Sequence, residues 1–281
     1  MKKRKRIQPS RYISLIILII FTIFALLPFF FFVELSLKPG VELIRNGINL
    51  NFQFDLMSFD NYKMLFTGKD GIYLYWYRNS VIITLLYTVM ALFLTSLVGY
   101  GMAVYEFKGK NLIFIIVLIV MMLPLEILIL PLFKLSVKLV LINKYMGVIL
   151  PFVVSPFSIF FFRQYALGIP KDFMDAARID GCSEYGIFFK IMMPLMLPAF
   201  GAMTILLAMN SWNGFIWPLM VLRDNAMLTL PIGLASLITP YGNNYDMLIA
   251  GAVISVIPIV AIFLLNQKAF ISGMTVGGVK G

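Results

Sequence analysis

Residues 170–198 read PKDFMDAARIDGCSEYGIFFKIMMPLMLP and form the only long polar interruption in the strongly apolar second half of the chain. Pro170 suits the first position of a helix, and Asp172 lies in the first turn, where the helix dipole favours an anion. Gly181 can adopt the left-handed conformation that ends a helix, and Ser183 can cap a second one. That second helix presents apolar residues at helical spacing, namely Ile187, Phe188, Ile191 and Met192. The stretch therefore predicts an amphipathic hairpin of two short helices.

The composition places the chain in a lipid bilayer. Of its 281 residues, 61% are hydrophobic, and its mean hydropathy is +0.93, whereas a soluble domain is about 45 to 50% apolar. The formal net charge of +10 does not indicate a nucleic-acid partner, because the positive residues are spread over loops instead of gathering on one face. We interpret the excess charge as a determinant of orientation in the membrane, with lipid as the surrounding partner.

The residue inventory argues against an enzyme. Cys182 is the only cysteine and there is no histidine, which excludes an intramolecular disulfide, a thiolate metal site, zinc chemistry, a Ser-His-Asp triad and a Cys-His pair. The Gly-Lys pairs at 68–69 and 109–110 are followed by Asp70 and Asn111 instead of Ser or Thr, so they do not form a phosphate-binding loop. We therefore expect no cofactor in this subunit, and we expect a partner protein to supply the energy for its activity.

The first 77 residues predict a membrane helix followed by an external segment. Residues 1–12 are basic and are expected in the cytoplasm, because basic flanks resist export. Residues 13–34 are the first predicted transmembrane helix, whose uncharged run reaches the roughly 20 residues that a bilayer core needs. Residues 35–77 are predicted to be extracytoplasmic. Within them, one short interfacial helix is predicted from the spacing of Phe59, Tyr62, Leu65 and Phe66.

Residues 78–268 are expected to form the membrane core, with the hairpin in a loop at 166–194 and a cytoplasmic tail at 269–281. Small residues such as Gly99 allow close approach of helices in lipid. Further spans are predicted at Val81–Tyr105, Leu112–Phe133, Tyr145–Phe162, Leu195–Leu222 and Met247–Leu265. The predicted fold class is all-α, a polytopic membrane bundle of six transmembrane helices with a cytoplasmic hairpin.

Polar residues inside the predicted spans are candidates for a solute pathway. Glu126 is the one clear acid in a span, and burying its charge in lipid costs at least about 2.5 kcal/mol. Asn210, Trp212 and Asn213 lie in the fifth span, and sugars bind through amide hydrogen bonds and aromatic faces. Because lipid supplies no hydrogen bonds, these groups need either a solute or neighbouring helices as partners. Both interpretations stay open, as does an interfacial position for Glu126.

The hairpin resembles the signature of a known family. The order Asp175-Ala176-Ala177, three residues, Gly181, nine residues, Ile191, one residue, Met193-Pro194 is similar to the coupling loop of ABC importer permeases. That loop usually has Glu-Ala-Ala, Gly and Ile-x-Leu-Pro, so Asp175 replaces Glu and Met193 replaces Leu. Other motifs, which together extend over residues 78–281, resemble the maltose-type sugar permeases: Arg78-Asn79-Ser80, Phe107-Lys108-Gly109-Lys110, Pro131-Leu132, Trp212-Asn213 with Pro218-Leu219, and Gly277-Gly278-Val279-Lys280-Gly281.

The resemblance implies the type I fold of ABC importer permeases and a set of partners. These partners are a second, related permease subunit that completes a heterodimer, a pair of ABC ATPases that bind ATP and Mg²⁺, and an extracytoplasmic solute-binding protein. Asp175 would meet a basic group on the ATPase. The coupling residues implied in this way are Phe173, Met174, Asp175, Ala176, Ala177, Gly181, Ile187, Phe188 and Pro194. The outer loop would contact the binding protein through Pro240, Tyr241, Asn243 and Asn244.

The sequence thus predicts the permease subunit of an ATP-driven importer that passes a sugar or related solute into the cytoplasm. It would lie in the cell membrane with both termini in the cytoplasm. Oligosaccharide, monosaccharide, polyol and glycerol phosphate stay open as solutes. One alternative is an ion-gradient-driven secondary transporter of a small polar solute, a class that usually shows intramembrane acids or broken repeats. Another is a membrane enzyme, which the residue inventory disfavours.

Overall fold

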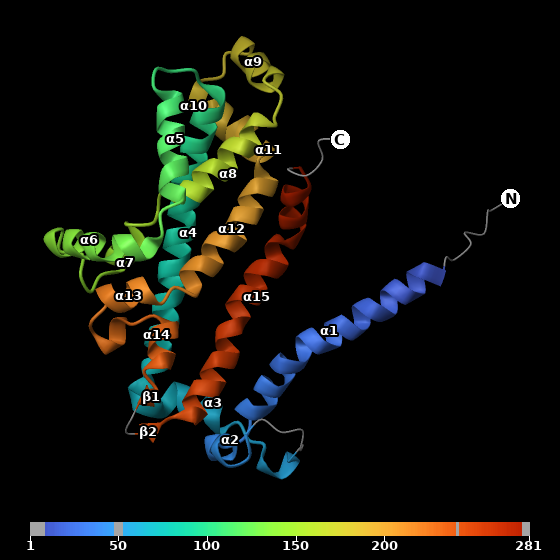
Figure 1. Ribbon diagram of the computed structural model, residues 1–281, viewed down its shortest axis with the longest axis vertical. Coiled ribbons are helices and arrows are strands. Elements are labelled where there is room, and N and C mark those ends of the chain that lie inside the picture. The colour runs from blue at the N-terminus through green and yellow to red at the C-terminus, as the bar shows by residue number, and fades with distance from the viewer. Residues whose placement is uncertain (1–8, 48–52, 240–241, 277–281) are drawn as a thin grey trace. The chain divides into compact units, whose positions relative to one another are not determined.

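The computed structural model describes residues 9–47, 53–239 and 242–276, and most of them are helical (Figure 1). The basic residues 1–8 and the C-terminal glycine motif at 277–281 lie outside the described residues. The chain divides into two units. The first contains the described residues up to Gly71 together with Leu234–Ile254, and the second contains Ile72–Gly233 and the described residues from Ser255 onward. The predicted all-α fold class is confirmed.

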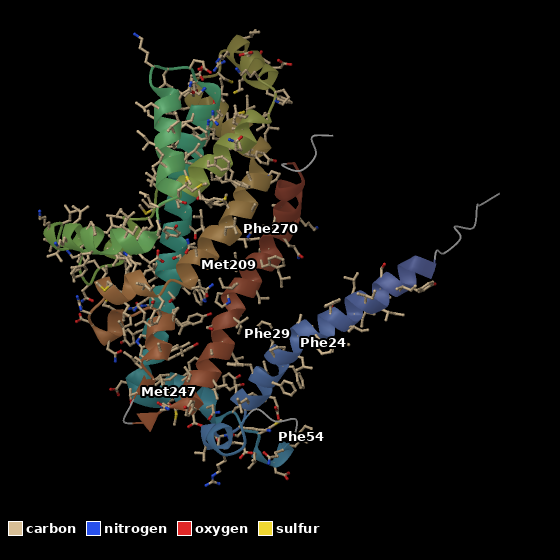
Figure 2. The ribbon with its side chains drawn as sticks, in the orientation of Figure 1. Phe24, Phe29, Phe54, Met209, Met247 and Phe270 are labelled. Carbon is tan, nitrogen blue, oxygen red and sulfur yellow. The ribbon has the colours of Figure 1, made fainter. Side chains whose placement is uncertain are left out.

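The first unit begins with a helix long enough to cross a bilayer. α1 (Pro9–Ser36) has 28 residues and is about 42 Å long at 1.5 Å per residue, more than the roughly 30 Å of a hydrocarbon core. It contains the predicted first span. Apolar side chains such as Phe24 and Phe29 are exposed along it (Figure 2), and none of the residues in its most apolar window is buried. α1 therefore presents an apolar surface around its circumference, as a membrane helix does.

The other elements of the first unit are short. They are α2 (Gly40–Asn46), η1 (Phe54–Leu56), α3 (Asp60–Thr67), η2 (Gly68–Gly71), the paired strands β1 (Ile238–Thr239) and β2 (Gly242–Asn243), and the start of α15 (Tyr245–Val276). The position of α3 confirms the short helix predicted from aromatic spacing. Asn61 of α3 donates hydrogen bonds to the carbonyl oxygens of Ser36 and Lys38, at 2.9 and 2.7 Å. These bonds satisfy the carbonyl group of Ser36 at the end of α1 and that of Lys38 just beyond it.

The second unit is built on one long helix, α4 (Ile72–Val104). The shorter helices that follow are α5 (Lys110–Met121), α6 (Leu125–Lys138), α7 (Tyr145–Ile149), α8 (Pro156–Leu167), α9 (Asp172–Ile179), α10 (Glu184–Ile187), the π-helix η3 (Phe188–Met192), α11 (Met193–Leu195), α12 (Leu197–Trp212), α13 (Ile216–Val221), η4 (Asn225–Met227), α14 (Leu230–Ala235) and the remainder of α15. α4 packs along α8 and α12 (Figure 1). The apolar core of the unit lies between these helices and includes Ala91, Phe162 and Met203.

Gly99 sets the distance between α4 and α8. A Cβ atom at this position would lie 2.7 Å from Cβ of Phe162 and 2.9 Å from the backbone nitrogen of Arg163, closer than real Cβ atoms approach such groups. The small residue predicted to allow close packing therefore does so. Gly101, two residues further on, has open space around its Cβ position.

The third predicted span, Leu112–Phe133, is not one helix. α5 ends at Met121, α6 begins at Leu125, and their axes are bent by 103°. Pro124 is extended, with φ −62° and ψ 132°; it cannot donate to the helix ladder and disfavours helical backbone at the residue before it. Pro131, in contrast, lies inside α6.

The fourth and fifth predicted spans are also interrupted. Tyr145–Phe162 divides into α7 and α8, and Pro156 begins α8 behind the cap of Ser155. The region Leu195–Leu222 divides into α12 and α13, and α12 is bent by 77° from the preceding helix segment. Among the described residues, three helices are long and apolar enough to cross a bilayer, or up to five spans are present if each bent pair counts as one. The prediction of six spans is therefore not confirmed.

We predict that Gly99→Leu lowers the thermal unfolding temperature of the purified protein, because the added side chain forces α4 and α8 apart at a cost of about 1–3 kcal/mol. Gly101→Leu is the matched control, because it makes the same change in the same helix without a close neighbour. Equal unfolding temperatures for the two variants would contradict this account of the α4–α8 contact.

Candidate functional site

The hairpin consists of α9, a tight turn at residues 180–183, and the helix segment α10–η3–α11. α9 begins at Asp172 with Lys171 as its cap residue, so the prediction that Pro170 is the first helical residue is wrong by two positions. Gly181 has φ +77°, and Cys182 N donates to the carbonyl of Ala177 at 3.0 Å. This is the left-handed helix end predicted from the sequence. Ser183 Oγ accepts a hydrogen bond from Gly186 N at 3.2 Å, which confirms the predicted cap of the second helix.

The inner face of the hairpin is buried in the core of the second unit. Met174, Ala177, Ile187, Phe188 and Met192 all belong to that core, and the side chain of Met174 is only 2% exposed. Met174, Ile187 and Phe188 were implied as coupling residues that contact the ATPase, and this is corrected: these side chains already pack against their own chain. Ala177 likewise faces the core instead of a partner. Their contribution is to fix the hairpin on the membrane unit, since burial removes their apolar surface from water.

The outer face of the hairpin carries a second set of apolar residues. Phe173 and Ala176 of α9 are exposed, as the implied contact with a partner requires. The sequence interpretation missed Ile179 and Tyr185, whose residues are 87% and 78% exposed. Ile179 lies three residues after Ala176, which is a helical spacing, but α9 has apolar residues on both faces, so this spacing did not single out Ile179. We call Phe173, Ala176, Ile179 and Tyr185 the outer face.

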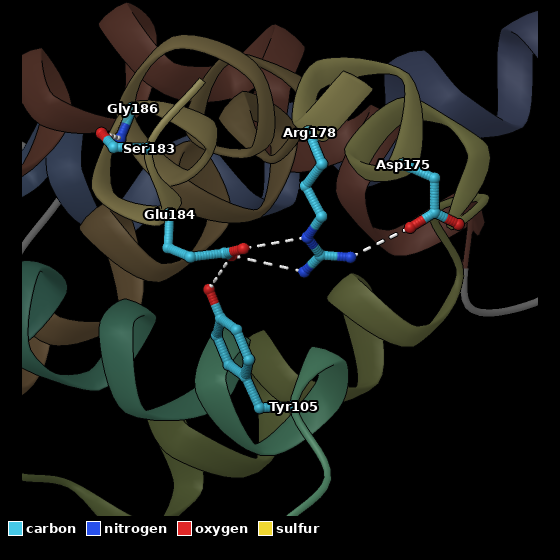
Figure 3. Close-up of polar contacts among 6 residues, drawn as sticks. All are labelled: Tyr105, Asp175, Arg178, Ser183, Glu184 and Gly186. Atoms are coloured by element: carbon cyan, nitrogen blue, oxygen red, sulfur yellow. Dashed lines mark hydrogen bonds and ion pairs between the residues drawn. The ribbon is translucent and has the colours of Figure 1, made fainter. Parts of the chain in front are cut away.

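Charged side chains connect the two arms of the hairpin (Figure 3). Arg178 of α9 donates from Nε to Glu184 Oε1 at 2.9 Å and from Nη2 to Glu184 Oε2 at 3.3 Å. It also donates from Nη1 to Asp175 Oδ1 at 2.9 Å. Tyr105, in the segment after α4, donates from its hydroxyl to Glu184 Oε2 at 2.5 Å. The hydrogen bonds from Arg178, and then that from Tyr105, lower the pKa of the Glu184 carboxyl, so Glu184 is ionised at neutral pH.

Asp175, the residue that stands where related loops have Glu, is therefore bonded within the hairpin. Its carboxylate is 62% exposed, so one oxygen bonds Arg178 while the group remains accessible from outside. Gly181 and Pro194 are exposed as well. Gly181 forms the turn, and Pro194 lies in α11. The structure thus places these three implied coupling residues on the exposed surface of the hairpin.

The candidate pathway residues are not brought into one site. Glu126 is exposed in the first turn of α6, which contacts α13. Asn210 and Asn213 are exposed at the end of α12. Trp212 is 4% exposed; its Nε1 donates to the carbonyl of Ser255 at 3.1 Å, and its ring packs edge-on against Tyr77. Trp212 therefore has partners on the chain's own helices, which is one of the two interpretations left open for this residue.

The loop implied to contact a binding protein is described only in part. Pro240 and Tyr241 lie outside the described residues. Asn243 is exposed in β2; it accepts a hydrogen bond from Thr239 N at 3.0 Å and donates to the hydroxyl of Tyr245 at 2.9 Å. Asn244 Oδ1 accepts from Met247 N at 3.0 Å and so caps the start of α15. The side-chain amides of Asn243 and Asn244 therefore stabilise the conformation of the loop.

A polar clamp near the start of α4 was not predicted. Asn79 is fully buried, and its amide nitrogen donates to the carbonyls of Ala226 and Leu228 at 2.8 and 2.9 Å. Its amide oxygen accepts from the hydroxyl of Tyr145 at 2.6 Å, and Ser80 Oγ accepts from Leu230 N at 2.8 Å. The Arg78-Asn79-Ser80 motif therefore has a structural basis, because its amide and hydroxyl fix the loop before α14.

Known proteins are similar to this chain in fold and in sequence. A solved bacterial ABC transporter involved in the import of the acidic polysaccharide alginate superposes with a TM-score of 0.79 at 23% identity, covering 95% of this chain and 100% of that one. A bacterial alginate ABC transporter in complex with an alginate pentasaccharide-bound periplasmic protein gives a TM-score of 0.61 at 14% identity, covering 92% of this chain and 94% of that one. The fold is thus that of an ABC importer permease.

The sequence comparisons are more specific. The family model described as "Binding-protein-dependent transport system inner membrane component" matches residues 95–276. The chain is 61% identical over 256 residues to the arabinooligosaccharides transport system permease protein AraQ of Bacillus subtilis (strain 168), with 91% of each chain covered. It is 32% identical to the lactose transport system permease protein LacG of Rhizobium radiobacter, again over 91% of each chain.

The chain belongs to the family of binding-protein-dependent transport system inner membrane components, and its relatives include sugar permeases. This confirms the resemblance seen in the hairpin motif. It favours an importer permease over both alternatives, the ion-driven secondary transporter and the membrane enzyme.

We predict that Gly181→Val destabilises the hairpin by about 1–2 kcal/mol, because a β-branched residue is strained at positive φ. Gly181→Asn should cost less, since Asn tolerates the left-handed conformation, and open space surrounds the Cβ position in both variants. A spin label on Cys182, the only cysteine, reports the change: we expect a more mobile spectrum for Val and a near-native one for Asn. Identical spectra for the two variants would remove backbone strain as the reason for glycine here.

Proposed function

We propose that this permease is driven by a pair of cytoplasmic ABC ATPases, which bind ATP and Mg²⁺, and that the ATPases dock on the outer face of the hairpin. The supporting observation is the division of the hairpin into two apolar faces. One face is buried against the core of the second unit. The other face is exposed and lies among charged side chains, and an exposed apolar surface of this kind is typical of a protein interaction surface. Asp175 lies on the same helix as Phe173, Ala176 and Ile179 and would pair with a basic group of the ATPase.

The hairpin would transmit motion through its packing. α10 continues through η3 and α11 and, after the 77° bend, into α12. Phe188 on the buried face also packs against Tyr100 of α4, with ring centroids 5.2 Å apart. Closure of the ATPase pair would therefore displace the hairpin as a body together with α4 and α12. Such a displacement is a hinge or shear movement, and it would exchange an outward opening for an inward one.

The remaining partners and the topology follow from the same assignment. The hairpin and both termini would lie in the cytoplasm, with residues 35–77 outside. A second, related permease subunit would complete a heterodimer, and the exposed Asn210, Asn213 and Glu126 would line the solute pathway between the subunits. An extracytoplasmic solute-binding protein would contact the loop that contains Asn243 and Asn244, as the periplasmic protein accompanies the alginate transporter.

We propose an oligosaccharide as the solute, and arabino-oligosaccharides in particular. The support is the 61% identity to AraQ over 91% of the chain. Because lactose permeases are related at only 32%, lactose provides the comparison solute.

We predict that the complete complex, purified and reconstituted in vesicles, takes up arabino-oligosaccharide only with ATP on the side of the hairpin and binding protein on the other. Lactose uptake should be lower, and a protonophore should have no effect. Uptake that needs no ATP and is lost with the protonophore would exclude an ATP-driven permease.

We predict that Ile179→Asp weakens retention of the ATPase on the tagged permease by about tenfold or more, equivalent to about 1.4 kcal/mol, because it places a charge on the apolar outer face. Folding should be unaffected, since Ile179 is 87% exposed. Phe54→Asp is the matched control, because it alters an exposed apolar residue in the segment proposed to lie outside the cell. Full retention of the ATPase by Ile179→Asp would show that the outer face is not the docking site.

A further inference from the structure

Tyr105 connects the end of α4 to the hairpin by two kinds of contact. Its hydroxyl donates to Glu184 at 2.5 Å, across 79 positions of the sequence. Its ring packs edge-on against Tyr100, with centroids 5.7 Å apart, and Tyr100 in turn packs against Phe188 of the hairpin. A polar connection and an apolar connection therefore run in parallel between the same two parts of the second unit.

The polar connection continues to the outer face. Glu184 binds Arg178 through two hydrogen bonds, and Arg178 binds Asp175 through a third. The series Tyr105, Glu184, Arg178 and Asp175 therefore begins beside α4 and ends on the helix that carries the outer face (Figure 3). Burial, and then the bond to Glu184, raise the pKa of the Tyr105 hydroxyl, so it remains a proton donor to the Glu184 carboxylate at neutral pH.

These bonds are poorly suited to a role in overall stability. The side chains of Arg178, Asp175 and Glu184 are 39%, 62% and 48% exposed, and exposed ion pairs contribute about 0–1 kcal/mol. The buried apolar face already holds the hairpin in place. The hydrogen bonds instead fix the orientation of the helices. A guanidinium fork that binds two carboxylates fixes the angle between α9 and α10. The Tyr105 bond fixes the orientation of α9 and α10 relative to α4.

We infer that Tyr105 is a positioning residue for energy coupling: its hydrogen bond to Glu184 makes α4 follow the hairpin when the ATPase moves it. This inference rests on the proposed function. Without the bond, the ATPases would still dock and still hydrolyse ATP, but part of each hairpin displacement would be lost before it reached α4. The expected defect is wasteful hydrolysis with intact assembly.

The test uses the complete complex, with Tyr105→Phe and Glu184→Leu made singly and together, because leucine, unlike glutamine, has no oxygen that could still accept from the Tyr105 hydroxyl. Tyr105→Phe removes the hydroxyl and keeps the ring contact with Tyr100. We expect the ATP hydrolysed per solute imported to rise at least threefold in each single variant and no further in the double variant, with ATPase retention as in the wild type. The matched control is Tyr165→Phe in α8, a partly buried tyrosine whose hydroxyl makes no hydrogen bond to another described residue; its ratio should stay at the wild-type value.

Three outcomes would overturn the inference. They are an unchanged ratio in Tyr105→Phe, an equal rise in Tyr165→Phe, and loss of the ATPase from the Tyr105→Phe complex, which would indicate a merely structural role. Failure of the proposed function is distinguishable, because the wild-type complex would then import no solute with ATP at all.

Discussion

The inner face of the hairpin packs against the core of the second unit, and the position of the hairpin depends on this packing. Met174, Ile187, Phe188 and Met192 are buried there, and complete burial of a side chain of this kind contributes about 1.5–3 kcal/mol. An exposed ion pair contributes far less, about 0–1 kcal/mol. The apolar contacts therefore hold the hairpin on the membrane helices, and the polar contacts set its orientation. Because interiors are close-packed, a hairpin held in this way moves its neighbours when it is moved.

The features that could be predicted from the sequence depend on local chemistry. Gly181 and Ser183 act within a few residues of themselves, and the structure has the left-handed turn and the helix cap that their identities predict. The uncharged run in α1 is long enough for a bilayer on its own, and the spacing of aromatic residues identified α3. The family could also be recognised, because the spacing between Asp175, Gly181 and Met193-Pro194 is a property of the sequence itself.

The features that could not be predicted depend on tertiary packing. A hydropathy run does not distinguish a straight span from two helices bent by 103°, and prolines do not settle the matter, because Pro124 lies at the break whereas Pro131 lies inside α6. The short helix α9 has apolar residues on both faces, so periodicity alone did not show that Met174 faces inward and Ile179 outward. The sequence left two interpretations of Trp212 open for the same reason, since its partner, Ser255, is distant in sequence.

The proposed mechanism requires the hairpin to face the cytoplasm, where a separate ATPase can move it. Cys182 tests this claim directly, because it is the only cysteine and is exposed in the turn of the hairpin. The measurement is labelling with a membrane-impermeant maleimide in intact cells and in inverted membrane vesicles. We predict labelling in inverted vesicles stripped of ATPase and none in intact cells. Labelling of Cys182 in intact cells would place the hairpin on the outer side of the membrane, where no cytoplasmic ATPase could reach it.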